Sequence, residues 1–170
     1  MINHLPDRLD LYATAEAGRV LQGRIKLASL DRVLSLLATR EGELQVLLEL
    51  GRDQDGTRYL SGSIKGMLVL QCQRCLEPME YLLDVRPRLG LVQSQDEAER
   101  LTEFYEPLIL TREPARLAEV ISDEVLLALP IVPLHEDMSK CQALATAFPA
   151  PASTPANNPF AVLEQLKQKQ

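Results

Sequence analysis

"TRYLSGSIKGMLVLQCQRCLEPMEYLLDVRPRLGL", residues 57–91, is the stretch that decides the fold. Residues 57–72 are strand-like, and residues 79–91 alternate apolar with charged side chains. The apolar face holds Tyr81, Leu83, Val85, Leu89 and Leu91, and the charged face holds Glu80, Asp84, Arg86 and Arg88. A period of two with one charged face is typical of a strand that has one side in water. The two strands predict a hairpin with the C-x-x-C pair, Cys72 and Cys75, at or beside its tip. Pro87 predicts an edge position or a bulge in the second strand.

Further strands are predicted on both sides of this hairpin. "RVLQGRIKL" (19–27) and "ELQVLLEL" (43–50) have strand-like alternation, and the polar "GRDQDG" (51–56) is a turn signal. The acidic stretch 93–107 is predicted to be a loop with a helical turn. "LIL" (108–110) is predicted to be one more short strand.

Two segments have the apolar spacing of amphipathic helices. In residues 29–42 the apolar positions Leu30, Val33, Leu34 and Leu37 recur at helical spacing, with Ser29 as the expected N-cap and Gly42 near the end. The second helix is expected to open at Pro114 and to end at Pro130. Its core stripe is Leu117, Val120, Ile121, Val125 and Ala128. The prediction is one α+β domain over residues 1–141, with a mainly antiparallel sheet and two packed helices.

The C-terminal part has a different composition. Residues 142–157 are rich in Ala, Pro, Ser and Thr and predict a flexible linker. "NPFAVLEQLKQKQ" (158–170) predicts a short amphipathic docking helix, with Pro159 at its first position and Phe160 and Leu163 on its apolar side. This helix could dock on a partner through these three residues, or it could pack back on its own domain.

Charge and composition restrict the classes of function. Residues 91–145 hold 4 Lys/Arg against 11 Asp/Glu, so this segment is a poor candidate for gripping nucleic-acid phosphates. It is either an ordinary solvated face or a surface that meets a basic protein. No signal peptide or membrane span is recognisable, so we expect a cytoplasmic protein with reduced thiols and no membrane partner.

The sequence shows no recognised catalytic motif. There is no phosphate-binding glycine loop, no G-x-S-x-G and no H-E-x-x-H, and only two histidines are present. We therefore predict that the protein is not an enzyme. The alternative is a thiol oxidoreductase that uses Cys72 and Cys75. That chemistry usually needs a helix directly after the cysteine pair, whereas a strand is predicted here.

A structural zinc site is the stronger chemical interpretation of the cysteines. Cys72 and Cys75 at a hairpin tip, with His135 and Cys141 after the second helix, would give a Cys3His ligand set. Four protein ligands leave no open position, so such a zinc ion would be structural. The other interpretation is that the cysteines are small, partly buried apolar residues and that His135 is an ordinary polar residue.

Four stretches in the same order resemble one known family. They are "LVLQCQRCLEP" (68–78), "FYEPLIL" (104–110), "DEVLLALPIVPLH" (123–135) and "NPFAVLEQLK" (158–167). Together they resemble the YceD family, the large ribosomal RNA subunit accumulation proteins. The resemblance implies a non-enzymatic cytoplasmic factor needed for synthesis, processing or stability of 23S rRNA. Its partner would be a ribosomal protein or a large-subunit assembly intermediate.

The resemblance leaves the manner of partner binding open. Five residues match recurring positions of the family's motifs or lie within them, and we predict that they contact a partner. They are Arg74, Glu124, Pro159, Phe160 and Leu163. Contact with rRNA is then indirect, through a basic protein that meets segment 91–145. The competing hypothesis is direct rRNA contact through the basic residues, which are Lys65, Arg74, Arg86 and Arg88. A zinc-braced interaction module unrelated to ribosomes is a further alternative.

Overall fold

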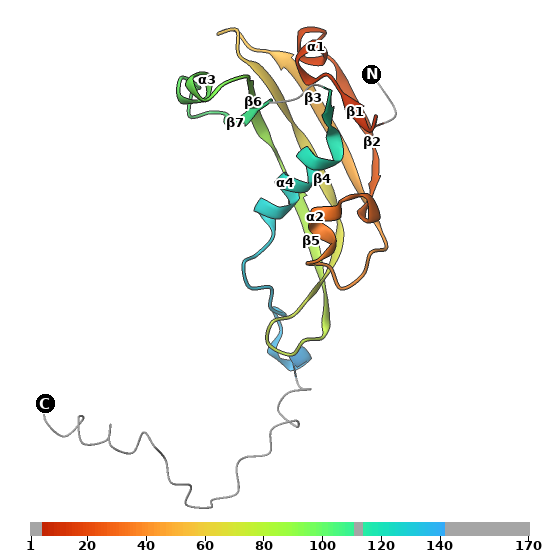
Figure 1. Ribbon diagram of the computed structural model, residues 1–170. Coiled ribbons are helices and arrows are strands. Elements are labelled where there is room, and N and C mark those ends of the chain that lie inside the picture. Colours follow the sequence, from red (N-terminus) through yellow and green to blue (C-terminus); the bar gives the residue numbers. More distant parts are fainter. Residues whose placement is uncertain (1–4, 111–113, 142–170) are drawn as a thin grey trace, which may run out of the picture.

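A long, curved sheet forms the body of the protein in the computed structural model (Figure 1), which describes residues 5–110 and 114–141. The strands run in the order β2-β3-β4-β6-β7, and β5 also pairs with β4. Their bounds are β2 Val20–Lys26, β3 Glu43–Arg52, β4 Arg58–Gln71, β5 Pro78–Val85, β6 Arg88–Val92 and β7 Glu106–Ile109. All pairs are antiparallel except β6 with β7, which is parallel. The predicted α+β class with a mainly antiparallel sheet is confirmed.

The long strand β4 organises this sheet. It pairs with β3 along one edge and with β5 and then β6 along the other. The single strand predicted over 79–91 is therefore two strands, which are interrupted at Pro87 because proline has no N–H to donate. The pairs Ile64–Val85 and Ser61–Arg88 lie on either side of the interruption in the same register, so Pro87 makes no bulge. The Gly62 N–H donates to the Pro87 carbonyl across the gap.

Helices cover one face of the sheet and leave the other in water. Residues 43–50 of β3 alternate between exposed and buried, as burial of a single face requires. Helices α2 (Asp31–Leu34) and α4 (Leu117–Ala128) pack against each other and on the core, and a further helix, α1 (Leu11–Glu16), contributes Leu11 and Ala15. The small helix α3 (Gln95–Glu99) forms the helical turn predicted in the acidic loop.

The helix predicted over residues 29–42 is much shorter than expected. It is a 3-10 turn, Leu27–Ser29, followed by the single turn α2. The residues after it leave the helical path because Leu37 forms a β-bridge with Leu70 and the Ala38 N–H donates to Val69. The prediction of Ser29 as N-cap is wrong: its hydroxyl donates to the Lys26 carbonyl, and the capping position falls at the next residue.

The second predicted helix has its core stripe and its end in the expected places, but its start is different. Pro114 lies before the helix because the next two residues form a short strand, β8 (Ala115–Arg116). This strand pairs with β1 (Arg8–Leu9), a pairing that local sequence does not signal. Helix α4 therefore begins at Leu117 and ends before Pro130.

The predicted linker 142–157 and docking helix 158–170 lie outside the described residues. Within the part of the chain that is described, every helix is too short or too polar to cross a membrane.

Candidate metal centre

The C-x-x-C pair lies at the tip of the β4–β5 hairpin, as predicted. The Cys72 N–H donates to the Glu77 carbonyl (3.0 Å), and the Leu76 N–H donates to the Cys72 carbonyl (2.9 Å). Leu76 has a φ of 63°, a left-handed conformation that is uncommon for a residue with a side chain. This tight turn places both sulfurs, Cys72 Sγ and Cys75 Sγ, on the same side of the hairpin.

The chain that follows α4 returns to this tip. The Gln73 N–H donates to the Pro133 carbonyl at 2.9 Å, which ties residues 130–135 to the hairpin. His135 Nε2 lies 3.3 Å from the Pro78 carbonyl oxygen. Since a carbonyl only accepts, Nε2 carries the proton in this contact, and Nδ1 keeps its lone pair as a metal ligand would. A carbonyl that fixes the histidine ring in this way is usual around metal-binding histidines.

The four predicted ligands meet at one point. Their ligand atoms, from Cys72, Cys75, His135 and Cys141, all lie within 4.8 Å of one another. We call this group the Cys3His cluster. The Cys72 and Cys141 sulfurs are 3.9 Å apart, and His135 Nδ1 lies 3.4 Å from the Cys75 sulfur and 3.5 Å from that of Cys141. A tetrahedral zinc ion with ordinary bond lengths separates two sulfurs by about 3.8 Å and a sulfur from a nitrogen by about 3.5 Å. The donor set and its spacing could therefore hold a metal ion.

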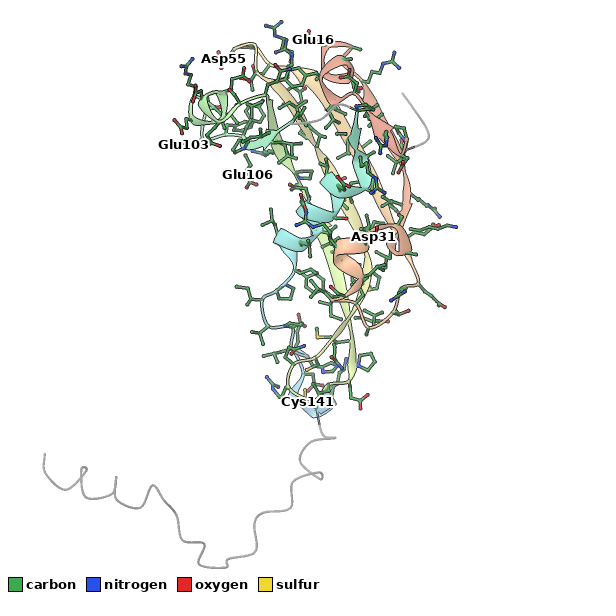
Figure 2. The ribbon with its side chains drawn as sticks, in the orientation of Figure 1. Glu16, Asp31, Asp55, Glu103, Glu106 and Cys141 are labelled. Carbon is green, nitrogen blue, oxygen red and sulfur yellow. The ribbon has the colours of Figure 1, made fainter. Side chains whose placement is uncertain are left out.

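The cluster is buried but is separate from the main core. The three cysteines are 0% (Cys72), 5% (Cys75) and 9% (Cys141) exposed, and they form their own small cluster. Among the described side chains, Met79 is the partly buried apolar residue that packs against it. All three cysteines are free, and 3.9 Å is far beyond a disulfide bond length. Figure 2 shows Cys141 at the opposite end of the molecule from Glu16 and Asp55. Among the described residues, this end of the hairpin has little apolar packing to hold it.

Electrostatics at the cluster favour one thiolate. Burial raises the pKa of the Cys72 thiol, but backbone N–H groups of Cys75, His135 and Arg74 outweigh it and bring the pKa from 9.0 to about 5. Burial and the neighbouring sulfurs of Cys75 and Cys72 raise the pKa of Cys141. Arg74 Nη1 lies 3.9 Å from the Cys141 sulfur, so one positive charge stands beside the group.

The other residues predicted to contact a partner are dispersed. Arg74 is exposed beside the cluster, whereas Glu124 is on α4, well away in sequence and structure. Burial and then the carboxylates of Glu106 and Asp123 raise the pKa of Glu124. Pro159, Phe160 and Leu163 lie outside the described residues.

The predicted basic face is largely occupied by contacts within the chain. Lys65 lies 3.1 Å from Asp84, and Arg86 lies 3.8 Å from the same carboxylate. The Arg88 guanidinium stands over the Phe104 ring, 4.8 Å from its centroid. These three cations are thus less available to phosphates than their positions in the sequence indicate.

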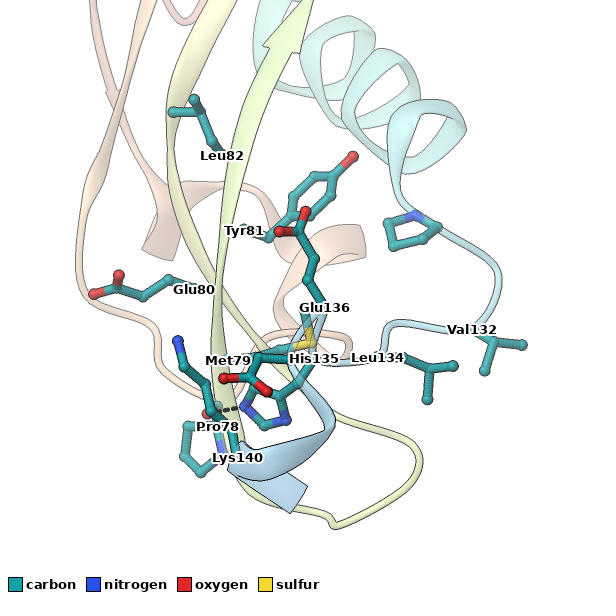
Figure 3. Close-up of a pocket in the computed structure, with 12 residues that line it drawn as sticks. Pro78, Met79, Glu80, Tyr81, Leu82, Val132, Leu134, His135, Glu136 and Lys140 are labelled. Atoms are coloured by element: carbon teal, nitrogen blue, oxygen red, sulfur yellow. Dashed lines mark hydrogen bonds between the residues drawn. The ribbon is translucent and has the colours of Figure 1, made fainter. Parts of the chain in front are cut away.

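Sequence reasoning missed a groove beside the Cys3His cluster (Figure 3). It has a volume of about 720 Å³ and lies between residues 78–82 of β5 and residues 130–140. Leu82, Val132 and Leu134 line it and are 73%, 56% and 37% exposed. The unbroken apolar run "IVPL" (131–134) after the helix was the available signal.

The fold and the site together define the class of protein: it is an α+β protein with a buried Cys3His cluster at a hairpin tip. The family model described as "Large ribosomal RNA subunit accumulation protein YceD" matches residues 60–167, and the chain belongs to this family. A protein of Haemophilus influenzae (strain ATCC 51907 / DSM 11121 / KW20 / Rd) is named "Large ribosomal RNA subunit accumulation protein YceD". It is 29% identical to this chain over an alignment of 170 residues that covers 97% of each chain. No solved structure matches the chain. The family description names accumulation of large-subunit rRNA and no chemical reaction.

Proposed function

We propose that this protein supports accumulation of 23S rRNA, and hence large-subunit assembly, by binding a partner in the cytoplasm and without catalysis. The observation that carries the proposal is the family match over residues 60–167, which includes all four residues of the Cys3His cluster. The name of the Haemophilus relative, which refers to accumulation of the large ribosomal RNA subunit, also supports the proposal.

The Cys3His cluster serves this function as a structural zinc site. Its support is the ligand spacing, the burial of the sulfurs, and the carbonyl that orients His135. Zinc would supply a strong crosslink between the hairpin tip and the chain after α4, at a place where apolar packing is sparse. The bound ion would have no open coordination position and would perform no chemistry.

The partner is a basic ribosomal protein or an assembly intermediate that presents one. Glu124 and Arg74 contribute to the contact, and rRNA is affected indirectly. Support comes from the excess of acidic residues in 91–145 and from the internal pairing of Lys65 and Arg86 with Asp84. A filter-binding salt series with 23S fragments tests this: a steep fall of affinity with salt would show direct phosphate contact and overturn it.

The main experiment compares ribosome profiles with metal content. Cells that lack the gene should accumulate fewer 50S particles, and wild-type protein should restore them. Cys75→Ser should carry less zinc and restore them poorly, whereas Gln45→Ala, a change of an exposed β3 side chain, should behave as wild type. Normal 50S levels without the gene would refute the function. Full activity of a zinc-free Cys75→Ser protein would refute an essential zinc site but not the role in rRNA accumulation.

Thiol redox chemistry is the second candidate, and one observation favours it: the lowered pKa of Cys72. Against it, the Cys72 side chain is fully buried, and the chain after Cys75 enters β5 and not a helix. Reduction of a disulfide substrate by purified protein, abolished in Cys75→Ser, would support this candidate in place of the binding function.

A further inference from the structure

The groove beside the Cys3His cluster is lined by large apolar side chains that are exposed to solvent. Leu82 projects from β5, and Val132 and Leu134 come from the chain after α4. Val132 and Leu134 lie on one side of β5, whereas Leu82 points to the other side (Figure 3). Exposed large apolar side chains in a concave site, such as Val132 and Leu134, usually meet a ligand or another polypeptide segment. In the described part of the chain, β5 pairs only with β4, so the groove also borders a free strand edge.

The rim of the groove is acidic. Glu80, Glu136 and Asp137 line it, with Lys140 as the single lining lysine. Figure 3 shows Glu80 on one side of β5 and Glu136, which comes from the returning segment, on the other. An occupant that fits this site has apolar side chains for the floor and positive charge for the rim.

Residues 158–170 have both properties. Phe160, Leu163 and Leu166 recur at three-residue spacing, and Lys167 and Lys169 lie near the end of the segment. With Glu164, its two lysines give a net side-chain charge of +1. The family match runs through the linker and ends at residue 167, so most of this segment belongs to the sequence that the family shares.

The last described residues, Lys140 and Cys141, lie beside the groove, so the chain that leads to residues 158–170 starts next to it. Lys140 lines the groove, and Cys141 is a member of the cluster next to it. Residues 142–157 separate Cys141 from Asn158. A stretch of about 16 extended residues spans up to about 55 Å, so reach does not limit docking. A tether of this length also gives the segment a high effective concentration at its own groove.

We propose that residues 158–170 dock into this groove of their own chain, with the apolar side chains over Val132 and Leu134 and the lysines against Glu136 and Asp137. The segment thereby covers the apolar surface beside the cluster when no other partner is bound. This inference is independent of the role in rRNA accumulation.

Photo-cross-linking of the full chain tests the proposal. Phe160 is replaced by p-benzoylphenylalanine, the protein is irradiated, and cross-linked peptides are mapped by mass spectrometry. Cross-links should fall within residues 78–82 or 130–137 and should form within one chain. The same photo-cross-linker at Thr154, in the linker, is the matched control and should give no preferred site.

Charge exchange then tests the assigned contact. Glu136→Lys should reduce the groove cross-link about tenfold, and adding Lys167→Glu with Lys169→Glu should restore it. Circular dichroism of each variant checks that the sheet is folded. Cross-links to other surfaces, cross-links only between two chains, or no effect of Glu136→Lys in a folded protein would each overturn the proposal.

Discussion

Removing the proposed zinc ion from the Cys3His cluster should release residues 130–141 from the hairpin and leave the sheet folded. The two regions depend on different interactions. The main core lies along β3, β4 and α4, whereas in the described part of the chain the cysteine cluster is a separate group with Met79 packed against it. Metal removal should therefore act locally.

The magnitudes support local release. Fixing the backbone costs about 1–2 kcal/mol per residue, so ordering the roughly ten residues after Pro130 costs of order 10 kcal/mol. The backbone and histidine hydrogen bonds to the hairpin, Gln73 to Pro133 and His135 to Pro78, contribute about 1 kcal/mol each. The sulfur contacts of Cys141 with Cys72 and Arg74 are long, at 3.9 Å. A structural zinc site contributes about 10–16 kcal/mol, which is of the required size.

Hydrogen exchange with and without EDTA measures the effect. Amides of residues 130–141 and of the hairpin tip should lose protection, amides of β3 should keep it, and added zinc should restore the first group. Cys141→Ser should reproduce the loss, and Gln45→Ala should not. Unchanged protection after elemental analysis has shown that the metal is gone would refute the reasoning.

Four other outcomes are expected. Leu68→Ala, a change of a side chain that is 0% exposed, should cost about 2–5 kcal/mol in urea unfolding without changing metal content. Gly62→Ala should cost more than about 1 kcal/mol by the same measurement, because its Cβ would lie 2.0 Å from the Leu47 carbonyl oxygen. Glu124→Gln should raise stability at pH 7 by about 0.5 kcal/mol. Burial and neighbouring carboxylates raise the pKa of Glu124, which disfavours its ionised form in the folded state, so this gain should disappear as the pH falls through the raised pKa. In metal-free protein the lowered pKa of Cys72 means that its thiolate stabilises the folded state. This contribution is complete above pH 9 and is lost as the pH falls to about 5. The urea concentration at the unfolding midpoint should therefore rise as the pH is raised from about 5 to 9.

Local sequence determined the strands and the hairpin. Alternation in residues 43–50 and 79–91, the turn at 51–56, and the position of Cys72 and Cys75 at a hairpin tip are all found in the structure. These features depend on neighbours in the chain: side chains of a strand alternate between two faces, and polar turn residues interrupt that pattern. The core stripe of α4 was predictable for the same reason.

Tertiary pairing decided what local patterns could not. Leu37 leaves the helical path because Leu70 is available across the sheet, and the strand at Ala115–Arg116 exists because β1 lies beside it. The sequence proposed His135 and Cys141 as ligands from residue type alone. Only the fold brings them within bonding reach of the hairpin, because the return of the chain after α4 is set by contacts distant in sequence. The groove is also a product of tertiary structure, since its two walls are about fifty residues apart in the chain and neither wall has a concave surface by itself.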